Sequence, residues 1–539
     1  MKKFLSILLT VAMLLTMSTT VFAAEDTSLN ITGPAGRTYA GYKLLNLTTS
    51  LKEGSHHPAA CDGNHSDDCY NYAYTVADKY RTILQNETHT NGRNELWVTN
   101  GKPATAAGVT DAQILEYLSG QSSDNGDVYM TMRLVADRIY RAIKAAGIEA
   151  DKTDLTGVND SIEQGYWMFA DVTNLTGNET NSLVMVDTKG QNAVTINPKT
   201  ALPTVEKKVK DIDDSEDDNI LDNGWNDSAD HDIGDTVPFK LTATLPSNAQ
   251  FYQSYKIVFH DTLSAGLTLN DASIKVLMYE TKHKADVDTD LNDSMKDVTA
   301  DFVITTDGLA DDCTFEVARE NIFTIEGVTK DTAFVVYYEA TLNDAAVMGS
   351  AGNANEVYLE FSNDPYGDST GDTESDKVVV FTYELIINKT DSHGHPLEGA
   401  GFTLYKKDIS GTYNVLGTEI KGDAMTTFTW SGLDDGDYKL VESTVPAGYN
   451  KMSDIAFSVS AEHSEINGEP SLTLLDGDLM GLGDVATGAI TKDIVNNTGT
   501  VLPETGAQGT FFLILGGALL VVVAAVFMIT RKKMSVYED

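Results

Sequence analysis

Four lysines crowd a short segment of an otherwise acidic chain. The segment is Thr195–Lys210, TINPKTALPTVEKKVK, and its amines are Lys199, Lys207, Lys208 and Lys210. An exposed lysine is a positive charge, whereas a lysine buried away from water loses its proton and becomes a nucleophile. In a strand, Lys207 shares a face with Val205 and Val209, so we expect it to point inward. Lys208 and Lys210 are expected to be solvated charges on the opposite face.

The usual signatures of an enzyme acting on an external substrate are missing from the sequence. No glycine-rich loop joins a strand to a helix, and there is no serine elbow or paired-histidine metal motif. The ten histidines are scattered, apart from His56, His57 and His65, whose spacing fits no standard zinc pattern. We therefore expect no cofactor, no metal centre and no enzyme that acts on an external substrate.

Composition gives the broad class of protein. The chain has 539 residues, of which 42% are hydrophobic, enough for three or four domains with true cores. It carries 38 basic and 80 acidic residues, a formal charge of −42. Such a charge argues against nucleic acid or anionic lipid as a partner.

Both ends look like processing signals. Residues 1–23 combine two lysines, a short apolar run and a small-residue cleavage site, which indicates a signal peptide. Residues 511–530 are uncharged and long enough to span a bilayer, and the basic triplet that follows would stay in the cytoplasm. Just before this span the sequence reads Leu502, Pro503, Glu504, Thr505 and Gly506. This motif, followed by an apolar span and a basic end, resembles the cell-wall sorting signal that sortases of Gram-positive bacteria cleave.

Between the ends, the pattern predicts a mainly β fold. Strands are expected at 37–48 and 165–175, with helical spacing at 76–84 and 135–143 between them. Further strands are expected at 236–245, 255–263, 333–342 and 356–363. We therefore predict tandem β-sandwiches, the first with inserted helices. The boundaries are 1–23 for the signal peptide, 24–200, 201–383 and 384–499 for three domains, and 500–539 for the sorting tail.

Three cysteines do not make a disulfide framework. Cys61 and Cys69 lie close enough in sequence to close a small loop, whereas Cys313 is expected to be a buried apolar residue. An acidic insert at 211–235 has the aspartate density of a calcium loop without the spacing of an EF-hand. It is either a cation site or a solvated loop.

Taken together, these pieces resemble the backbone subunit of a sortase-assembled pilus, with immunoglobulin-like Cna-A- and Cna-B-type sandwiches. The segment YKLVESTVPAGY, residues 438–449, is similar to the pilin E-box, with Ser443 and Val445 as departures from it. The resemblance implies that Glu442 promotes an isopeptide bond between Lys389 and Asn496. Asn497 is the alternative amide.

The middle domain carries an equivalent pattern. By resemblance, Lys207 would be joined to Asn363, with Asp261 as the promoting acid and Glu339 as the alternative acid. A buried carboxyl keeps its proton and can polarise the amide carbonyl while the amine attacks. Ammonia leaves, and a neutral amide replaces a buried charge that would cost several kcal/mol.

The resemblance also implies the function. Lys199, in INPKT, stands where these pilins carry their linking lysine, although Asn197 replaces the usual tyrosine. Its amine would join Thr505 of the next copy and build a wall-anchored surface pilus that supports adhesion. The implied partners are class C and housekeeping sortases, further copies of the chain, accessory pilins, peptidoglycan and host surface ligands. The alternative is a monomeric wall-anchored adhesin.

Overall fold

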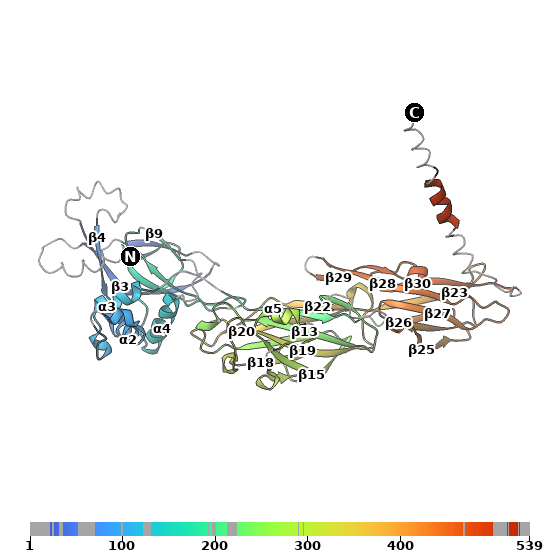
Figure 1. Cartoon of the computed structure of the whole chain (residues 1–539), viewed down its shortest axis with the longest axis horizontal. Helices are drawn as coiled ribbons and strands as arrows, with labels where there is room; N and C mark the ends of the chain where they lie inside the picture. The colour runs from blue at the N-terminus through green and yellow to red at the C-terminus, as the bar shows by residue number, and fades with distance from the viewer. Residues whose placement is uncertain are drawn as a thin grey trace, which may run out of the picture.

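The computed structural model arranges the chain as three successive β-rich modules, with an apolar helix near the C-terminus (Figure 1). The modules follow one another along the long axis, from blue through green and yellow to orange. The described residues are 22–23, 26–31, 36–51, 70–98, 101–121, 131–175, 177–191, 193–196, 201–212, 224–288, 290–294, 296–466, 469–499, 515, 517–526 and 528.

The two terminal signals lie largely outside the described residues. Of the expected signal peptide, the structure describes only Phe22–Ala23. Of the expected span at 511–530, it describes residues 515, 517–526 and 528, which are helical and exposed. Within the described residues, no helix is long and apolar enough to cross a membrane.

The N-terminal module packs one sheet between a smaller sheet and a group of helices. The larger sheet has the order β1-β3-β7-β8, with β4 and β5 also paired to β3, and the smaller has the order β6-β2-β9. The strands expected at 37–48 and 165–175 are confirmed as β3 and β7. The strands are β1 (Phe22–Ala23), β2 (Asp26–Ile31), β3 (Tyr39–Leu51), β4 (Tyr70–Val76), β5 (Lys152–Leu155), β6 (Asp160–Glu163), β7 (Gly165–Asp171), β8 (Leu183–Asp187) and β9 (Ala193–Ile196).

Alternation along β7 builds a core on each side of the larger sheet. Trp167 and Phe169 pack toward the smaller sheet, while Met168 and Ala170 pack toward the helices. Both faces of the strand are thus buried, which explains its continuous apolar sequence.

The expected helices are present with shifted ends. Val76 ends β4 rather than starting a helix, and the helix predicted around it begins later, at Arg81. A helix between the two expected ones was not predicted. The helices are α2 (Arg81–Asn91), α3 (Asp111–Ser119) and α4 (Thr131–Ala145), with short 3-10 turns η2 (Asp78–Tyr80), η3 (Asn94–Trp97) and η4 (Ala106–Gly108).

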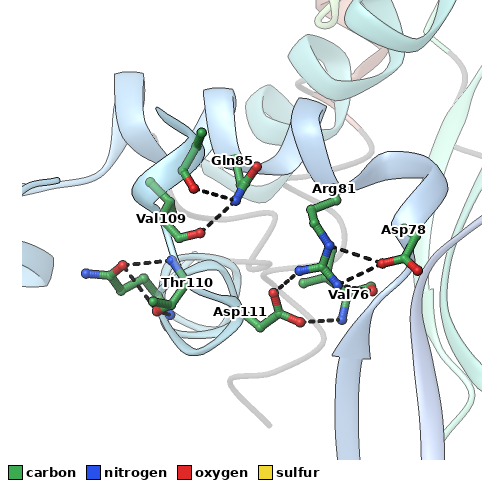
Figure 2. A network of polar contacts seen from close by, with 9 residues as sticks. Val76, Asp78, Arg81, Gln85, Val109, Thr110 and Asp111 are labelled. Atoms are coloured by element: carbon green, nitrogen blue, oxygen red, sulfur yellow. Dashed lines mark hydrogen bonds and ion pairs between the residues drawn. The ribbon is translucent and has the colours of Figure 1, made fainter. Parts of the chain in front are cut away.

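A polar network fixes the start of α2 against the start of α3 (Figure 2). Arg81 donates hydrogen bonds to both Asp78 and Asp111, and Gln85 donates to the carbonyl of Val109 at 2.9 Å. Thr110 caps α3 with a reciprocal capping box. These contacts stabilise the packing of α2 against α3, and none of them involves a predicted site residue.

The middle module is a sandwich of two sheets. Their orders are β11-β10-β13-β19-β15-β16 and β12-β22-β20-β14-β18-β17, with β21 paired to β20. The four strands expected from sequence are confirmed as β13, β14, β19 and β20. The elements are β10 (Thr204–Lys210), β11 (Trp225–Asn226), β12 (Ser228–Asp230), β13 (Thr236–Thr244), η5 (Ala249–Phe251), β14 (Ile257–Leu263), β15 (Leu267–Tyr279), α5 (Lys282–Val287), β16 (Lys296–Asp297), η6 (Thr299–Asp301), β17 (Val303–Thr305), β18 (Phe315–Arg319), η7 (Ile322–Thr324), β19 (Ala333–Leu342), η8 (Gly349–Ala351), β20 (Asn353–Ser362), β21 (Thr370–Asp372) and β22 (Asp376–Phe381).

The C-terminal module is a smaller sandwich in which the first and last strands lie side by side. Its sheets have the orders β26-β23-β30 and β25-β24-β27-β28-β29, and β23 pairs with β30 in parallel. The elements are β23 (Tyr383–Asp391), β24 (Gly401–Lys407), β25 (Tyr413–Lys421), β26 (Thr427–Leu433), β27 (Gly436–Thr444), β28 (Ile455–Ile466), β29 (Glu469–Asp476), η9 (Asp478–Met480) and β30 (Ala489–Asn496). The mainly β fold predicted from sequence is confirmed.

Strand β22 couples the middle and C-terminal modules through its two faces. Val378 and Val380 belong to the middle core, while Val379 and Phe381 pack with the C-terminal core. Because successive side chains of a strand point in opposite directions, one strand serves both cores.

Acidic residues reinforce this junction. Asp230 accepts a hydrogen bond from Tyr383, and Asp232 accepts one from Lys406 at 2.6 Å. Both carboxylates are buried, so this part of the 211–235 insert is not the solvated loop considered above. Residues 213–223 of the insert lie outside the described residues.

Candidate crosslinking sites

The core of the middle module encloses an amine, a carboxyl and an amide. Lys207 comes from β10, Asp261 from β14 and Asn355 from β20, and none of the three is exposed. The Nζ of Lys207 donates hydrogen bonds to Asp261 and, at 2.6 Å, to Oδ1 of Asn355. The amine therefore lies next to the amide across the sandwich, with an acid beside the amine.

Burial shifts the pKa values of Lys207 and Asp261 so that each favours its neutral form. It lowers the pKa of Lys207 from 10.5 to about 8, against the attraction of Asp261. It also raises the pKa of Asp261, with Lys207 and Tyr338 opposing the shift. A proton transfer from the ammonium to the carboxylate would leave a free amine and a neutral acid.

Tyr338 of β19 completes this cluster. Its hydroxyl accepts a hydrogen bond from Lys207 at 3.2 Å, and its ring stacks on Phe239 with centroids 5.2 Å apart. The aromatic rings exclude water around the amine, which is the condition for its lowered pKa.

Asn363 does not contact Lys207, which corrects the expected pairing. Its side chain instead donates to the carbonyl of Thr370 at 2.8 Å and accepts from Ser369 at 2.6 Å. Both asparagines follow the same alternation along the chain, but Asn363 lies eight residues further on, roughly 26 Å along an extended strand. The sequence pattern thus identified the correct face of the strand but the wrong position along it.

The two acids considered for this site are now distinguished. Asp261 is in the cluster, whereas Glu339 points away from the core and accepts a hydrogen bond from Tyr337 at 2.8 Å. The expected orientations on β10 are also confirmed. Lys207 is fully buried, while Lys208 is only half-buried and pairs with Asp227 at 2.5 Å.

The C-terminal module contains a second set of the same three groups. Lys389 lies on β23, Glu442 on β27 and Asn496 on β30, and all three are buried. The Nζ of Lys389 donates to the carbonyl of Ile494 at 2.9 Å, which holds it beside β30. Burial lowers the pKa of Lys389 to about 8, with Glu442 opposing the shift.

Glu442 contacts the amide side chain directly. Nδ2 of Asn496 donates to Oε1 of Glu442 at 2.6 Å, while the backbone N–H of Met452 donates to Oε2 at 2.9 Å. Oδ1 of Asn496 is buried and accepts no hydrogen bond from the described residues. Exchanging the two amide atoms would set the carbonyl oxygen of Asn496 against the carboxyl of Glu442, and a proton on that carboxyl would then polarise the amide.

The alternative amide, Asn497, does not share this environment. Its side chain is exposed, and its backbone carbonyl accepts a hydrogen bond from Asn450 at 3.0 Å. Asn496 alone of the two is buried against Glu442, because neighbouring residues of a strand point to opposite faces.

The remaining expected residues divide into two groups. Lys199, Cys61, Cys69, the histidines at 56, 57 and 65 and the Leu502–Gly506 motif lie outside the described residues. Cys313 is described, and it is half-buried on the surface of the middle module rather than buried as an apolar residue.

Three family models match successive parts of the chain. A Cna-B-like domain of Gram-positive pilin backbone subunits matches residues 233–365, a prealbumin-like fold domain matches residues 383–470, and the LPXTG cell wall anchor motif matches residues 494–535. These segments include Asp261, Asn355, Lys389, Glu442 and Asn496.

Two curated proteins are similar in sequence. The trypsin-resistant surface T6 protein of Streptococcus pyogenes serotype M6 is 23% identical over 510 residues, which is 80% of this chain and 88% of that protein. Fimbrial subunit type 1 of Actinomyces viscosus is 36% identical over 101 residues, 19% of this chain and 16% of that protein.

Solved structures of pilins were also found. The T6 backbone pilin of S. pyogenes serotype M6 is 17% identical with a TM-score of 0.47, covering 89% of this chain and 100% of that one. The full-length major pilin SpaD from Corynebacterium diphtheriae is 12% identical with a TM-score of 0.40, covering 90% and 99%. From the family models, the chain is a Gram-positive pilin backbone subunit with Cna-B-like and prealbumin-like domains, a structural protein anchored to the cell wall as part of a surface pilus.

Proposed function

We propose that this backbone subunit forms the shaft of a covalently polymerised pilus. A class C sortase would cleave after Thr505 and join that residue to the amine of Lys199 on the next copy. A housekeeping sortase would attach the finished fibre to peptidoglycan. Accessory pilins and adhesion to host surfaces complete the proposed role. The support is the anchor motif at residues 494–535 and a lysine after Pro198, shortly before the middle module in the sequence.

We further propose two internal isopeptide bonds, Lys207–Asn355 and Lys389–Asn496. The observation that carries this proposal is the burial of an amine, an acid and an amide together in each of two cores. In each, Nζ would attack Cγ of the asparagine, the C–N bond to Nδ2 would break, and ammonia would leave. Of the three protons on the starting ammonium, one stays on the new amide, one passes to Nδ2, which leaves as ammonia, and one passes to the acid, Asp261 or Glu442, which ends neutral.

The positions of these bonds suit a fibre under tension. Lys389–Asn496 would join the first and last strands of the C-terminal module, which are already paired in parallel. Lys207–Asn355 would join β10 to β20 in the facing sheet. A covalent bond between the ends of a module carries load without opening the noncovalent ladder, and it slows unfolding and proteolysis.

Replacing Lys199 tests whether this residue joins successive subunits of the polymer. With Lys199→Ala or Lys199→Arg, we expect the high-mass ladder of wall-extracted protein to disappear, leaving monomer that is still anchored to the wall. Lys208→Ala is the matched control, because Lys208 is paired with Asp227 and should leave the ladder unchanged. A ladder that persists in the Lys199 variants would move the linkage to another amine, with Lys189 and Lys208 next. Absence of a ladder in the unmodified strain would instead support a monomeric adhesin.

A further inference from the structure

Four potential metal ligands of different types meet on the outer face of the middle module. His260 lies on β14, Glu316 opposite it on β18, and Asp311 and Cys313 in the turn that leads into β18. One ligand atom from each residue lies within 4.8 Å of the other three. Alternation along β14 places His260 on the opposite face from Asp261, so this cluster is separate from the crosslinking site.

The imidazole of His260 is held with one nitrogen facing the cluster. Nδ1 lies 2.7 Å from Oδ2 of Asp311 and 3.5 Å from Oε1 of Glu316. The ring stacks on Tyr358 with centroids 4.5 Å apart and planes 4° apart. Only 8% of His260 is exposed, so this orientation is fixed by packing.

A second layer of residues supports these ligands. Behind the imidazole, Nε2 faces Oε2 of Glu360 at 3.6 Å, and Lys256 holds Glu360 at 3.0 Å. The hydroxyl of Tyr358 donates to Oδ2 of Asp311 at 2.7 Å. Metal-binding histidines commonly have a carboxylate behind the second ring nitrogen, where it fixes the tautomer and strengthens the ligand.

The donor set indicates the kind of metal. One nitrogen, one sulfur and two carboxylate oxygens are the ligands that zinc and similar divalent transition metals accept, usually four at a time. In a tetrahedral site with metal–ligand bonds of about 2.0–2.3 Å, the ligand atoms stand roughly 3–4 Å apart. The atoms of the cluster need only small side-chain shifts to reach that geometry.

Local charge also favours a cation. Asp311, Glu316 and Glu360 bring three carboxylates to one spot. Among the side chains described here, the permanent positive charge paired within this group is that of Lys256, which bonds Glu360. A divalent ion between Asp311 and Glu316 would neutralise the two remaining negative charges.

We propose that His260, Asp311, Cys313 and Glu316 form a binding site for a divalent metal of the zinc type. The bound ion ties the turn before β18 to β14 and so braces the outer surface of the middle module. It needs a neutral imidazole and a thiolate, so binding displaces the proton of the Cys313 thiol.

The test uses soluble protein of residues 24–500, which holds every described element of the three modules except β1. Cys61→Ser and Cys69→Ser leave Cys313 as the one thiol. Zn²⁺ titration by calorimetry should give one site per chain, and Co²⁺ should give a thiolate-to-cobalt charge-transfer band. Cys313→Ser should remove that band, and His260→Gln or Asp311→Asn should weaken Zn²⁺ binding about tenfold or more.

Asp312→Asn is the matched control, because Asp312 neighbours the cluster without belonging to it, and asparagine tolerates its left-handed backbone at φ 61°. This variant should bind Zn²⁺ like the parent. The proposal is overturned if the parent protein binds no Zn²⁺ at one site per chain, or if Co²⁺ binds without a thiolate band. It is also overturned if Cys313→Ser and Asp312→Asn have the same effect. The Co²⁺ spectrum of the parent decides the question even where a variant misfolds.

Discussion

The hydroxyl of Tyr338 joins Asn355 to Asp261. It accepts a hydrogen bond from Nδ2 of Asn355 at 2.6 Å and donates one to Oδ1 of Asp261 at 3.0 Å. Nδ2 is the nitrogen that would leave as ammonia, so Tyr338 provides a path for a proton from the acid to the leaving group. The sequence analysis considered only a lysine, an acid and an amide for this site, so it did not identify Tyr338.

Tyr338→Phe should slow formation of the Lys207–Asn355 bond without preventing folding. The ring and its stacking on Phe239 remain, while the link between acid and leaving nitrogen is lost. The fraction of freshly made protein that has lost ammonia can be followed by intact mass over time. Tyr337→Phe is the control, since that hydroxyl bonds Glu339 on the outer face. Equal rates for the two variants would exclude the relay.

The amide partner of Lys207 can be identified by mass. Each isopeptide bond removes one ammonia, about 17 Da, so soluble protein of residues 24–500 should lie about 34 Da below its sequence mass. Asn355→Ala should halve that deficit, as should Lys207→Ala or Asp261→Ala.

Asn363→Ala and Glu339→Ala serve as matched controls for the same measurement. Neither side chain reaches Lys207, so both variants should keep the full deficit. A halved deficit in Asn363→Ala together with a full one in Asn355→Ala would restore the pairing expected from sequence. No deficit in the parent protein would remove both proposed bonds.

The sequence predicts the face of a strand better than the position along it. Lys207 could be placed inward because Val205 and Val209 flank it at alternate positions, and burial confirms this. Asn363 obeyed the same alternation as Asn355, yet its distance from β10 depends on how β20 lies across the facing sheet. No local pattern carries that information.

Contacts between residues far apart in the sequence could not be predicted either, because they also depend on how the strands pair. Cys313 looked like an isolated apolar residue because its neighbour His260 lies far off in sequence, on a strand paired with β18. Only the register of β14 against β18 brings them together. By contrast, the motif around Glu442 fixed three residues of the C-terminal module, since Lys389 and Asn496 lie on its first and last strands.

Glu442→Ala should block the second bond and weaken the C-terminal module. Without the acid, Lys389 stays a buried amine beside an intact Asn496, and a buried lysine without its partner costs about 3 kcal/mol or more. We expect a mass deficit reduced by about 17 Da, a lower unfolding temperature and faster trypsin cleavage between 384 and 499. Glu462→Ala is the control, because Glu462 lies on β28 outside the buried triad. Unchanged mass in Glu442→Ala would mean that another group promotes the bond.

A variant that keeps Lys389 but cannot form the bond should gain a distinctive pH dependence. In Asn496→Ala, burial still lowers the pKa of the folded lysine to about 8, while the unfolded lysine keeps 10.5. Between these values the unfolded chain holds the proton and the folded chain does not. Stability therefore rises with pH across this window and is flat below it.

The measurement is the unfolding temperature of Asn496→Ala from pH 7 to about pH 10.5, compared with Lys389→Met/Asn496→Ala, which has no amine to titrate. Other groups titrate alike in both proteins, so only the difference between the two curves reports Lys389. That difference should be largest below pH 8, with the single variant less stable, and should close as the pH approaches 10.5. Parallel curves would show that the lysine is already solvated. In the parent protein the amine is consumed in an amide, so no such rise is expected.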